Sequence, residues 1–164
     1  MRVSFRRVRE ADLRRLNELV NDEQVSRYLS VTPPVPMKKT RDFFESLRKS
    51  ARRWYAVLVD GQVAGAAGIS PKPRDCKQAH VAEVGIDLDP RIWGKGVGEK
   101  AMGHLLGEAK KMGLKRLELQ LVKENKRALN LYLKSGYKVE GTKKKAFKLG
   151  RGYVDVYIMG RWIR

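Results

Sequence analysis

The chain has one cysteine and two histidines among its 164 residues, and it contains no long apolar run. A single thiol, Cys76, excludes an intrachain disulfide and is typical of a reducing compartment. No segment approaches the roughly 20 apolar residues that a membrane helix needs, and residues 1–13 lack the apolar core of a secretory signal. These absences predict a cytoplasmic protein with no membrane segment.

Acidic residues are scarce relative to basic ones: 18 Asp and Glu stand against 36 Lys and Arg, a net charge of +18. Such an excess attracts nucleic acid, because the contact releases counterions from phosphates. The basic residues are nevertheless dispersed, mostly in pairs with one triplet at 143–145, which is typical of a solvated surface. Nucleic-acid binding is therefore the less favoured main activity. Association with ribosomes or another anionic partner stays open, as does a homodimer.

Hydrophobic periodicity predicts seven strands, over residues 3–8, 54–59, 62–69, 81–88, 116–122, 137–142 and 153–159. It predicts four helices, one after Asp12 and the others over residues 40–50, 99–112 and 126–134. Asp60-Gly61 is typical of a two-residue hairpin turn. No repeat or domain break is visible, so we expect residues 1–164 to form one α/β domain. Its central sheet would be mixed and mostly antiparallel, flanked by about four helices.

Between the fourth predicted strand and the third predicted helix stand three alternate glycines, Gly94, Gly96 and Gly98. A strand, a glycine turn and a helix N-terminus form an anion site, because free amides and the helix dipole face the ligand. Lys95 adds a point charge. The spacing does not fit a Walker A loop, and the preceding hairpin does not fit the dinucleotide variant that ends at Ala101. A turn that only allows close packing is the structural alternative.

A second ordered pattern follows the next strand: Asn125, Ala128, Tyr132, Gly136 and Tyr137. With the glycine loop, and with the run 82–90 that leads into it, this pattern resembles the GNAT superfamily of acetyl-CoA-dependent N-acetyltransferases. That family's second segment is commonly N-x-x-A-x-x-x-Y-x-x-x-G-F/Y. The strand order is similar too, so the resemblance extends over nearly the whole chain. It implies the GNAT fold and transfer of acetyl from acetyl-CoA to a primary amine.

One position departs from the family pattern, which is commonly Q/R-x-x-G-x-G/A in the loop. With Gly96 and Gly98 as the motif glycines, the first position holds Trp93; with Gly94 and Gly96 it holds Arg91. Such W-G-K-G variants resemble members related to the ribosomal-protein N-terminal acetyltransferases. The backbone amides are present in either frame, so acetyl-CoA stays the expected cofactor.

The resemblance also implies cofactor-binding roles for particular residues. Backbone groups of Ile86 and Leu88 would bind the pantetheine arm as an added strand does. Asn125 would hydrogen-bond the cofactor. The pyrophosphate would bind the loop made of Gly94, Lys95, Gly96, Val97, Gly98 and Glu99.

Two residues are candidates for proton transfer. Tyr132 is the candidate acid for the departing thiolate, because the pKa of a phenol matches that of a thiol better than a carboxylic acid does. Glu83, on the strand before the loop, is the candidate base and would act through water. The structural alternatives are that Tyr132 only packs a helix face and that Glu83 only faces solvent. Ribosomal-protein relatives place a catalytic Glu where this chain has Gln120, which is no base; Glu118, on the same strand face, is the substitute.

The acceptor is less defined than the cofactor. Residues 28–36 fall where relatives build the acceptor cleft, or they simply connect two helices. The acceptor would be a protein N-terminus, a lysine or a small amine, and the basic surface disfavours polyamines. His80 and His104 lack the spacing of metal ligands, so no metal is expected. The alternative function is a non-catalytic acyl-CoA-binding or RNA- or ribosome-associated basic module on the same scaffold.

Overall fold

The computed structural model describes residues 1–164. The strands are β1 (Val3–Arg7), β2 (Arg53–Val59), β3 (Gln62–Pro71), β4 (Val81–Leu88), β5 (Arg116–Val122), β6 (Lys138–Leu149) and β7 (Gly152–Trp162). The helices are α1 (Leu13–Asn21), α2 (Glu23–Ser26), α3 (Met37–Ser46), α4 (Val97–Lys111) and α5 (Lys126–Lys134). None of them combines the length and apolar character needed to cross a bilayer. The expected α/β class is confirmed, with α2 as an unpredicted fifth helix.

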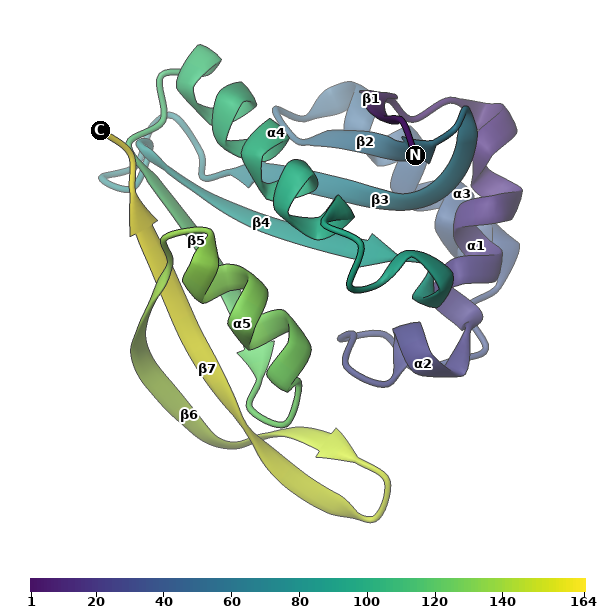
Figure 1. The fold of residues 1–164 in the computed structure, drawn as a ribbon. Helices are drawn as coiled ribbons and strands as arrows, with labels where there is room; N and C mark the ends of the chain where they lie inside the picture. Colours follow the sequence, from purple (N-terminus) through teal and green to yellow (C-terminus); the bar gives the residue numbers. More distant parts are fainter.

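All seven strands form one sheet in the order β1-β2-β3-β4-β5-β7-β6. Only β4 and β5 run parallel, and they pair over just three positions, from Val81↔Arg116 to Glu83↔Glu118. Beyond these positions the two strands diverge, as Figure 1 shows in the gap between them. The mostly antiparallel arrangement is therefore interrupted at one place, in the middle of the sheet.

Two apolar clusters cover the two faces of the sheet. Helices α4 and α5 lie on one face (Figure 1), and there Leu105 packs with Val57 and Ile69 in the larger cluster. On the other face Leu13 and Leu16 of α1 pack against the β2 and β3 residues Ala56, Leu58 and Ala66. Successive residues of β2 thus enter opposite clusters, as the pleat of a strand buried on both faces requires.

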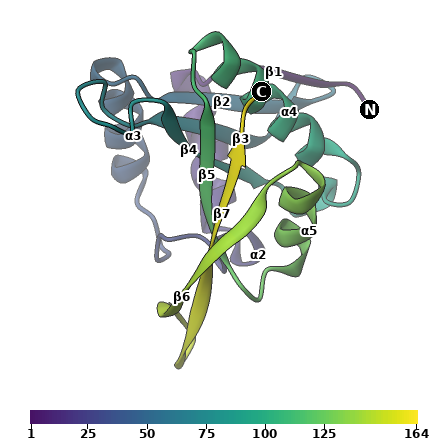
Figure 2. The ribbon, with the colours of Figure 1, turned by 90° about the vertical axis from the view of Figure 1, so that its left-hand side faces the viewer.

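The β6–β7 hairpin is longer than the sequence indicates, and Figure 2 shows it extending beyond the rest of the molecule. Strand β6 continues to Leu149 instead of ending at Thr142. Most of its side chains are exposed lysines and other polar groups, held in place by backbone pairing with β7. An edge strand of this kind has no apolar alternation for a sequence pattern to detect.

Two helix boundaries differ from prediction, and one predicted cap lacks its hydrogen bond. Helix α4 starts at Val97, so Gly98 and Glu99 belong to its first turn. Helix α3 covers 37–46 and ends in a short 3-10 turn, instead of spanning 40–50. Asp12 is the N-cap residue of α1 as predicted, but its carboxylate makes no bond to the helix; it accepts the Arg9 amide at 2.8 Å and pairs with Arg6 at 2.6 Å.

Candidate active site

A cavity of about 780 Å³ opens where β4 and β5 diverge. Its walls come from α2 and the loop after it, from residues 83–88 of β4, from residues 119–122 of β5, and from α5 and the β6–β7 hairpin. Because parallel strands that separate leave backbone groups unpaired, this is the place in the sheet where an extended ligand can add to an edge. The cavity is the candidate active site.

Tyr132 contributes to this cavity from the inward face of α5. The residue is only 7% exposed, yet its hydroxyl makes no hydrogen bond to the protein. Burial raises the pKa of Tyr132 above its ordinary value, and the negative charge of Asp87 raises it further. The hydroxyl therefore keeps its proton across the working pH range. The same loss of solvent raises the pKa of a thiol in the cavity, so a phenol remains a suitable donor to a departing thiolate.

Strand β4 offers one free edge to the cavity. The Asp89 amide donates to Ala64 of β3 at 2.8 Å, and the Val81 carbonyl accepts from Lys72 at 2.9 Å. Antiparallel pairing uses every second residue, so the backbone groups of Ile86 and Leu88 point away from β3. The backbone groups of Ile86 and the Leu88 amide are therefore open where binding of the pantetheine arm is predicted, whereas the Leu88 carbonyl accepts the Trp93 indole N–H.

The glycine loop has an uninterrupted series of free amides. From Gly94 to Glu99 no backbone N–H donates to a backbone carbonyl, and the first to do so is that of Lys100, which bonds Gly96 at 3.2 Å. Gly94 and Gly96 have φ values of +72° and +76°, and a Cβ at either would meet no atom within 4 Å. This arrangement fits a pyrophosphate, because amides and the N-terminus of α4 face one open space.

Gly98 has a different role from the other two glycines. A Cβ built on Gly98 would lie 2.9 Å from Leu131 of α5, so its absence lets α4 and α5 pack closely. The alternative interpretation, a glycine that permits close packing, thus applies to this position. Lys95 and Glu99 are exposed beside it. All of these loop residues lie outside the cavity lining, next to its Trp93 wall.

Trp93, which departs from the family pattern, ties the loop to β4. Its indole N–H donates to the Leu88 carbonyl at 2.9 Å, and the Arg127 guanidinium lies 4.0 Å from the ring centroid. Sequence reasoning did not find this role. Its only signal was an aromatic residue where a polar one is usual.

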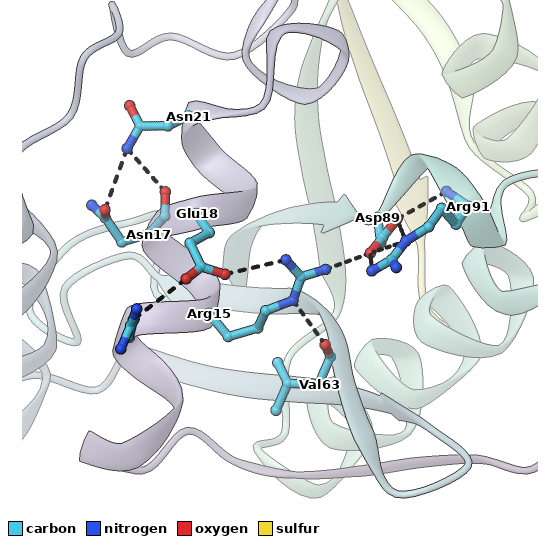
Figure 3. Close-up of polar contacts among 8 residues, drawn as sticks. Arg15, Asn17, Glu18, Asn21, Val63, Asp89 and Arg91 are labelled. Atoms are coloured by element: carbon cyan, nitrogen blue, oxygen red, sulfur yellow. Dashed lines mark hydrogen bonds and ion pairs between the residues drawn. The ribbon is translucent and has the colours of Figure 1, made fainter.

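The start of the loop is held by ion pairs that centre on the buried Asp89. Figure 3 shows this carboxylate between Arg15 of α1 and Arg91, whose guanidinium lies 2.6 Å away. Hydrogen bonds from Arg91, and its charge together with that of Arg15, hold the pKa of Asp89 below its usual value. Arg91, the alternative occupant of the Q/R position, is thus engaged with Asp89. The contact fastens the end of β4 to a helix far away in the sequence.

Asn125 is the N-cap of α5 and lines the cavity. Its Oδ1 accepts the Ala128 amide at 3.2 Å, which leaves its amide nitrogen as a donor without a protein partner. A hydrogen bond from Asn125 to the cofactor would use that nitrogen, and it stays a prediction.

The carboxylates proposed as bases are both ion-paired. Glu83 lines the cavity with a half-exposed side chain, and Lys72 lies 2.5 Å from it. Glu118 pairs with Arg116 at 2.8 Å and is not part of the lining. Gln120 lines the cavity and accepts a hydrogen bond from Lys143 at 3.1 Å. Of the two, only Glu83 faces the cavity.

The segment 28–36 is divided between two roles. Tyr28 and Leu29 line the cavity, as the acceptor-cleft interpretation requires. Val35 is instead buried, and its backbone is held by the side chains of Asn17 and Asn21. The proline-rich part is therefore a connection between helices.

Two further carboxylates were missed by sequence reasoning. Asp87 lines the cavity from β4, and burial raises its pKa to about 6. Glu108 is a buried residue of α4, and its carboxylate accepts hydrogen bonds from the Tyr55 hydroxyl, Arg53 and Lys111. Glu108 stands three residues after the inward-facing Leu105, so helical spacing was a usable signal for its burial.

Comparisons with known proteins agree with this geometry. The profile of the Acetyltransferase (GNAT) family matches residues 14–137. The L-amino acid N-acetyltransferase AaaT of Escherichia coli (strain K12) is 34% identical over 104 residues, which are 63% of this chain and 64% of that protein. The chain thus matches somewhat less than two thirds of that relative. The spermidine N(1)-acetyltransferase of Escherichia coli (strain K12) is 28% identical, over 85% of this chain and 74% of that one.

A solved structure has the same fold. The spermidine N-acetyltransferase from Vibrio cholerae, in complex with CoA and spermine, superposes with a TM-score of 0.89 at 21% identity, covering 98% of this chain and 95% of that one. The chain belongs to the GNAT family of acetyltransferases. The expected class of enzyme, an N-acetyltransferase that uses acetyl-CoA, is confirmed at this level.

Proposed function

We propose that the protein transfers acetyl to a primary amine by direct attack within the cavity between β4 and β5. The observation that carries this proposal is Tyr132, a buried residue on the cavity wall whose hydroxyl is protonated and makes no hydrogen bond to the protein. A packing tyrosine would gain stability from a hydrogen bond to the protein, whereas a proton donor has to keep that bond for the ligand.

Acetyl-CoA, when bound, supplies an acetyl thioester that an uncharged amine attacks, so that the thiolate leaves without a covalent enzyme intermediate. The free amides from Gly94 to Glu99 would bind its pyrophosphate, and Ile86 and Leu88 would bind the pantetheine arm. Asn125 would hydrogen-bond the cofactor. Lys95 would add positive charge beside the loop.

Two side chains then transfer protons, one as the acid and one as the base. Tyr132 holds a proton at its hydroxyl oxygen for the thiolate. Glu83 receives, through water, the proton that the amine loses, and Lys72 beside it compensates the charge of the carboxylate. Replacing Glu83 with Gln should lower kcat about 100-fold or more, as loss of a general base does. Glu118→Gln is the matched control, and a loss confined to that variant would move the role to Glu118.

The acceptor is a protein N-terminus, a lysine or a small amine. The names of relatives include L-amino acids, spermidine and a ribosomal-protein alanine as acceptors. The net charge of +18 repels a polycation, which favours acceptors with few positive charges. Release of free thiol from acetyl-CoA, measured across L-amino acids, alanine-initiated peptides and polyamines, tests the proposal. No thiol release with any of these amines would contradict it.

The exposed lysines of β6 favour one second function, a non-catalytic acyl-CoA-binding or RNA- or ribosome-associated basic module. This module would bind a short single-stranded RNA with an affinity that falls steeply as salt rises. It would release no thiol with any amine. Two measurements, turnover and salt-dependent RNA binding, therefore distinguish the enzyme from the non-catalytic module.

A further inference from the structure

We propose that Asp87 binds the amino group of the acceptor and positions it over Gly85, which makes the substrate class a cationic primary amine. This inference rests on the proposed function, since it assigns the acceptor half of the same cavity. It is distinct from the proton-transfer role of Glu83.

The register of β4 places three residues on one face of the sheet. Ser70, Gly68 and Ala66 of β3 pair in turn with Glu83, Gly85 and Asp87. The alternate residues Val84 and Leu88 enter the core under α4. Because side chains alternate along a strand, Glu83 and Asp87 project on the opposite face, toward α1 and α2. The acceptor side of the cavity thus has the carboxylates of Glu83 and Asp87, with Gly85, which has no side chain, between them.

Asp87 differs from its neighbours in having no partner. Glu83 pairs with Lys72 and Asp89 with Arg15 and Arg91, whereas no hydrogen bond or ion pair reaches the Asp87 side chain. This is unusual in a chain with twice as many basic as acidic residues. A partly buried carboxylate without a cation is unfavourable, and an ammonium ion removes that cost.

Gly85 leaves the space that an amino group requires. A Cβ built on Gly85 would meet no atom within 4 Å, so the floor between the two carboxylates is open. Residues two apart on a strand are about 6.7 Å apart. An amine over Gly85 therefore lies within reach of a side chain on each side. Asp87 attracts its charged form, and Glu83 takes the proton through water.

The other charged and titratable groups of the cavity come from four elements. They are Glu23, Arg27 and Tyr28 from the α2 region, Glu83 from β4, Arg127 and Tyr132 from α5, and Lys143 from β6. The Arg127 guanidinium lies over the Trp93 ring, Glu83 forms an ion pair with Lys72, and Lys143 donates a hydrogen bond to Gln120. Because the pKa of Asp87 is raised to about 6 by burial, its attraction for an ammonium should be present above pH 6 and lost below it.

The first experiment compares Asp87→Asn with the wild type in steady-state kinetics. The acceptors are L-alanine, an alanine-initiated tripeptide and spermidine. We expect the acceptor KM to rise about 10- to 100-fold, the size of a lost charged hydrogen bond, while kcat and the KM for acetyl-CoA change less than about threefold. Asp42→Asn, which removes an equal charge from the exposed surface of α3, is the control. An unchanged acceptor KM in Asp87→Asn would overturn the proposal.

The second experiment separates this proposal from the proposed function. Calorimetry measures binding of the same three amines to the CoA-bound protein, without turnover. We expect wild-type affinity to weaken from pH 7 to pH 5 and the affinity of Asp87→Asn to be weak and flat. If the wild type releases no thiol, the proposed function fails, and this titration still decides the role of Asp87. Equal pH dependence in both proteins would refute it.

Gly85→Ala tests amine binding at this place if Asp87→Asn does not fold. The added methyl meets no protein atom, so thermal stability should not fall. It occupies the floor of the cavity, and the acceptor KM should rise several-fold. An acceptor KM equal to that of the wild type would count against amine binding at this place.

Discussion

The indole N–H of Trp93 donates to the carbonyl of Leu88 across 2.9 Å and so joins the glycine loop to the end of β4. The two residues belong to different parts of the predicted cofactor site, the loop for pyrophosphate and the strand edge for pantetheine. One hydrogen bond thus links the two parts of the predicted site.

Trp93→Phe keeps an aromatic ring under Arg127 but removes the indole N–H and with it this hydrogen bond. A single hydrogen bond contributes about 0.5–1.5 kcal/mol, so we expect the KM for acetyl-CoA to rise about 2- to 10-fold while the acceptor KM is unchanged. Trp54→Phe, on β2 in the smaller apolar cluster, is the matched control. If both variants have the wild-type KM, the contact has no part in cofactor binding.

Tyr132→Phe should lower kcat about 100- to 1000-fold with little change in the KM for acetyl-CoA, because only the proton donor is lost. Stability should hardly change, since the hydroxyl makes no hydrogen bond to the protein. Tyr137→Phe is the control: that ring is also buried, its centroid lies 6.0 Å from that of Tyr132, and it does not line the cavity. Undiminished turnover in Tyr132→Phe would remove it from the mechanism.

Gly96→Ala tests the loop at a position where φ is +76°. The left-handed conformation costs a non-glycine residue about 1–2 kcal/mol, so the variant should be less stable and bind acetyl-CoA more weakly. Gly103→Ala, in the middle of α4 with open space around it, should instead raise stability by about 0.8–1.0 kcal/mol. Chemical unfolding and acetyl-CoA titration measure both effects. A destabilised Gly103→Ala would mean that α4 is constrained in some other way.

Glu108 should make stability pH-dependent in acid. Hydrogen bonds from Lys111 and Tyr55 lower its pKa from 4.5 to about 2. Its contribution is therefore complete above pH 4.5 and disappears as pH falls toward 2, because the unfolded chain binds the proton first. The difference in unfolding free energy between the wild type and Glu108→Gln should shrink over that range. A difference independent of pH would show that the Glu108 charge contributes nothing.

Much of the fold follows from local signals. The Asp60-Gly61 turn, the strand at 81–88 and the helix at 126–134 have the predicted positions, because each depends on neighbours in the sequence. The side-chain cap at Asp12 was wrong because a contact outside the helix decides it: Asp12 stands at the start of α1 as predicted, but its carboxylate bonds Arg6. The extension of β6 to Leu149 likewise depends on its pairing with β7.

The sequence by itself determined the family, since Asn125, Tyr132 and the alternate glycines stand at fixed spacings along the chain. Only the tertiary structure decided which carboxylates are neutralised. Glu83 meets Lys72, Asp89 meets Arg15, and Asp87 meets no cation. Charges interact through space, and the strand register and helix packing that bring them together are not written in the spacing of any one segment.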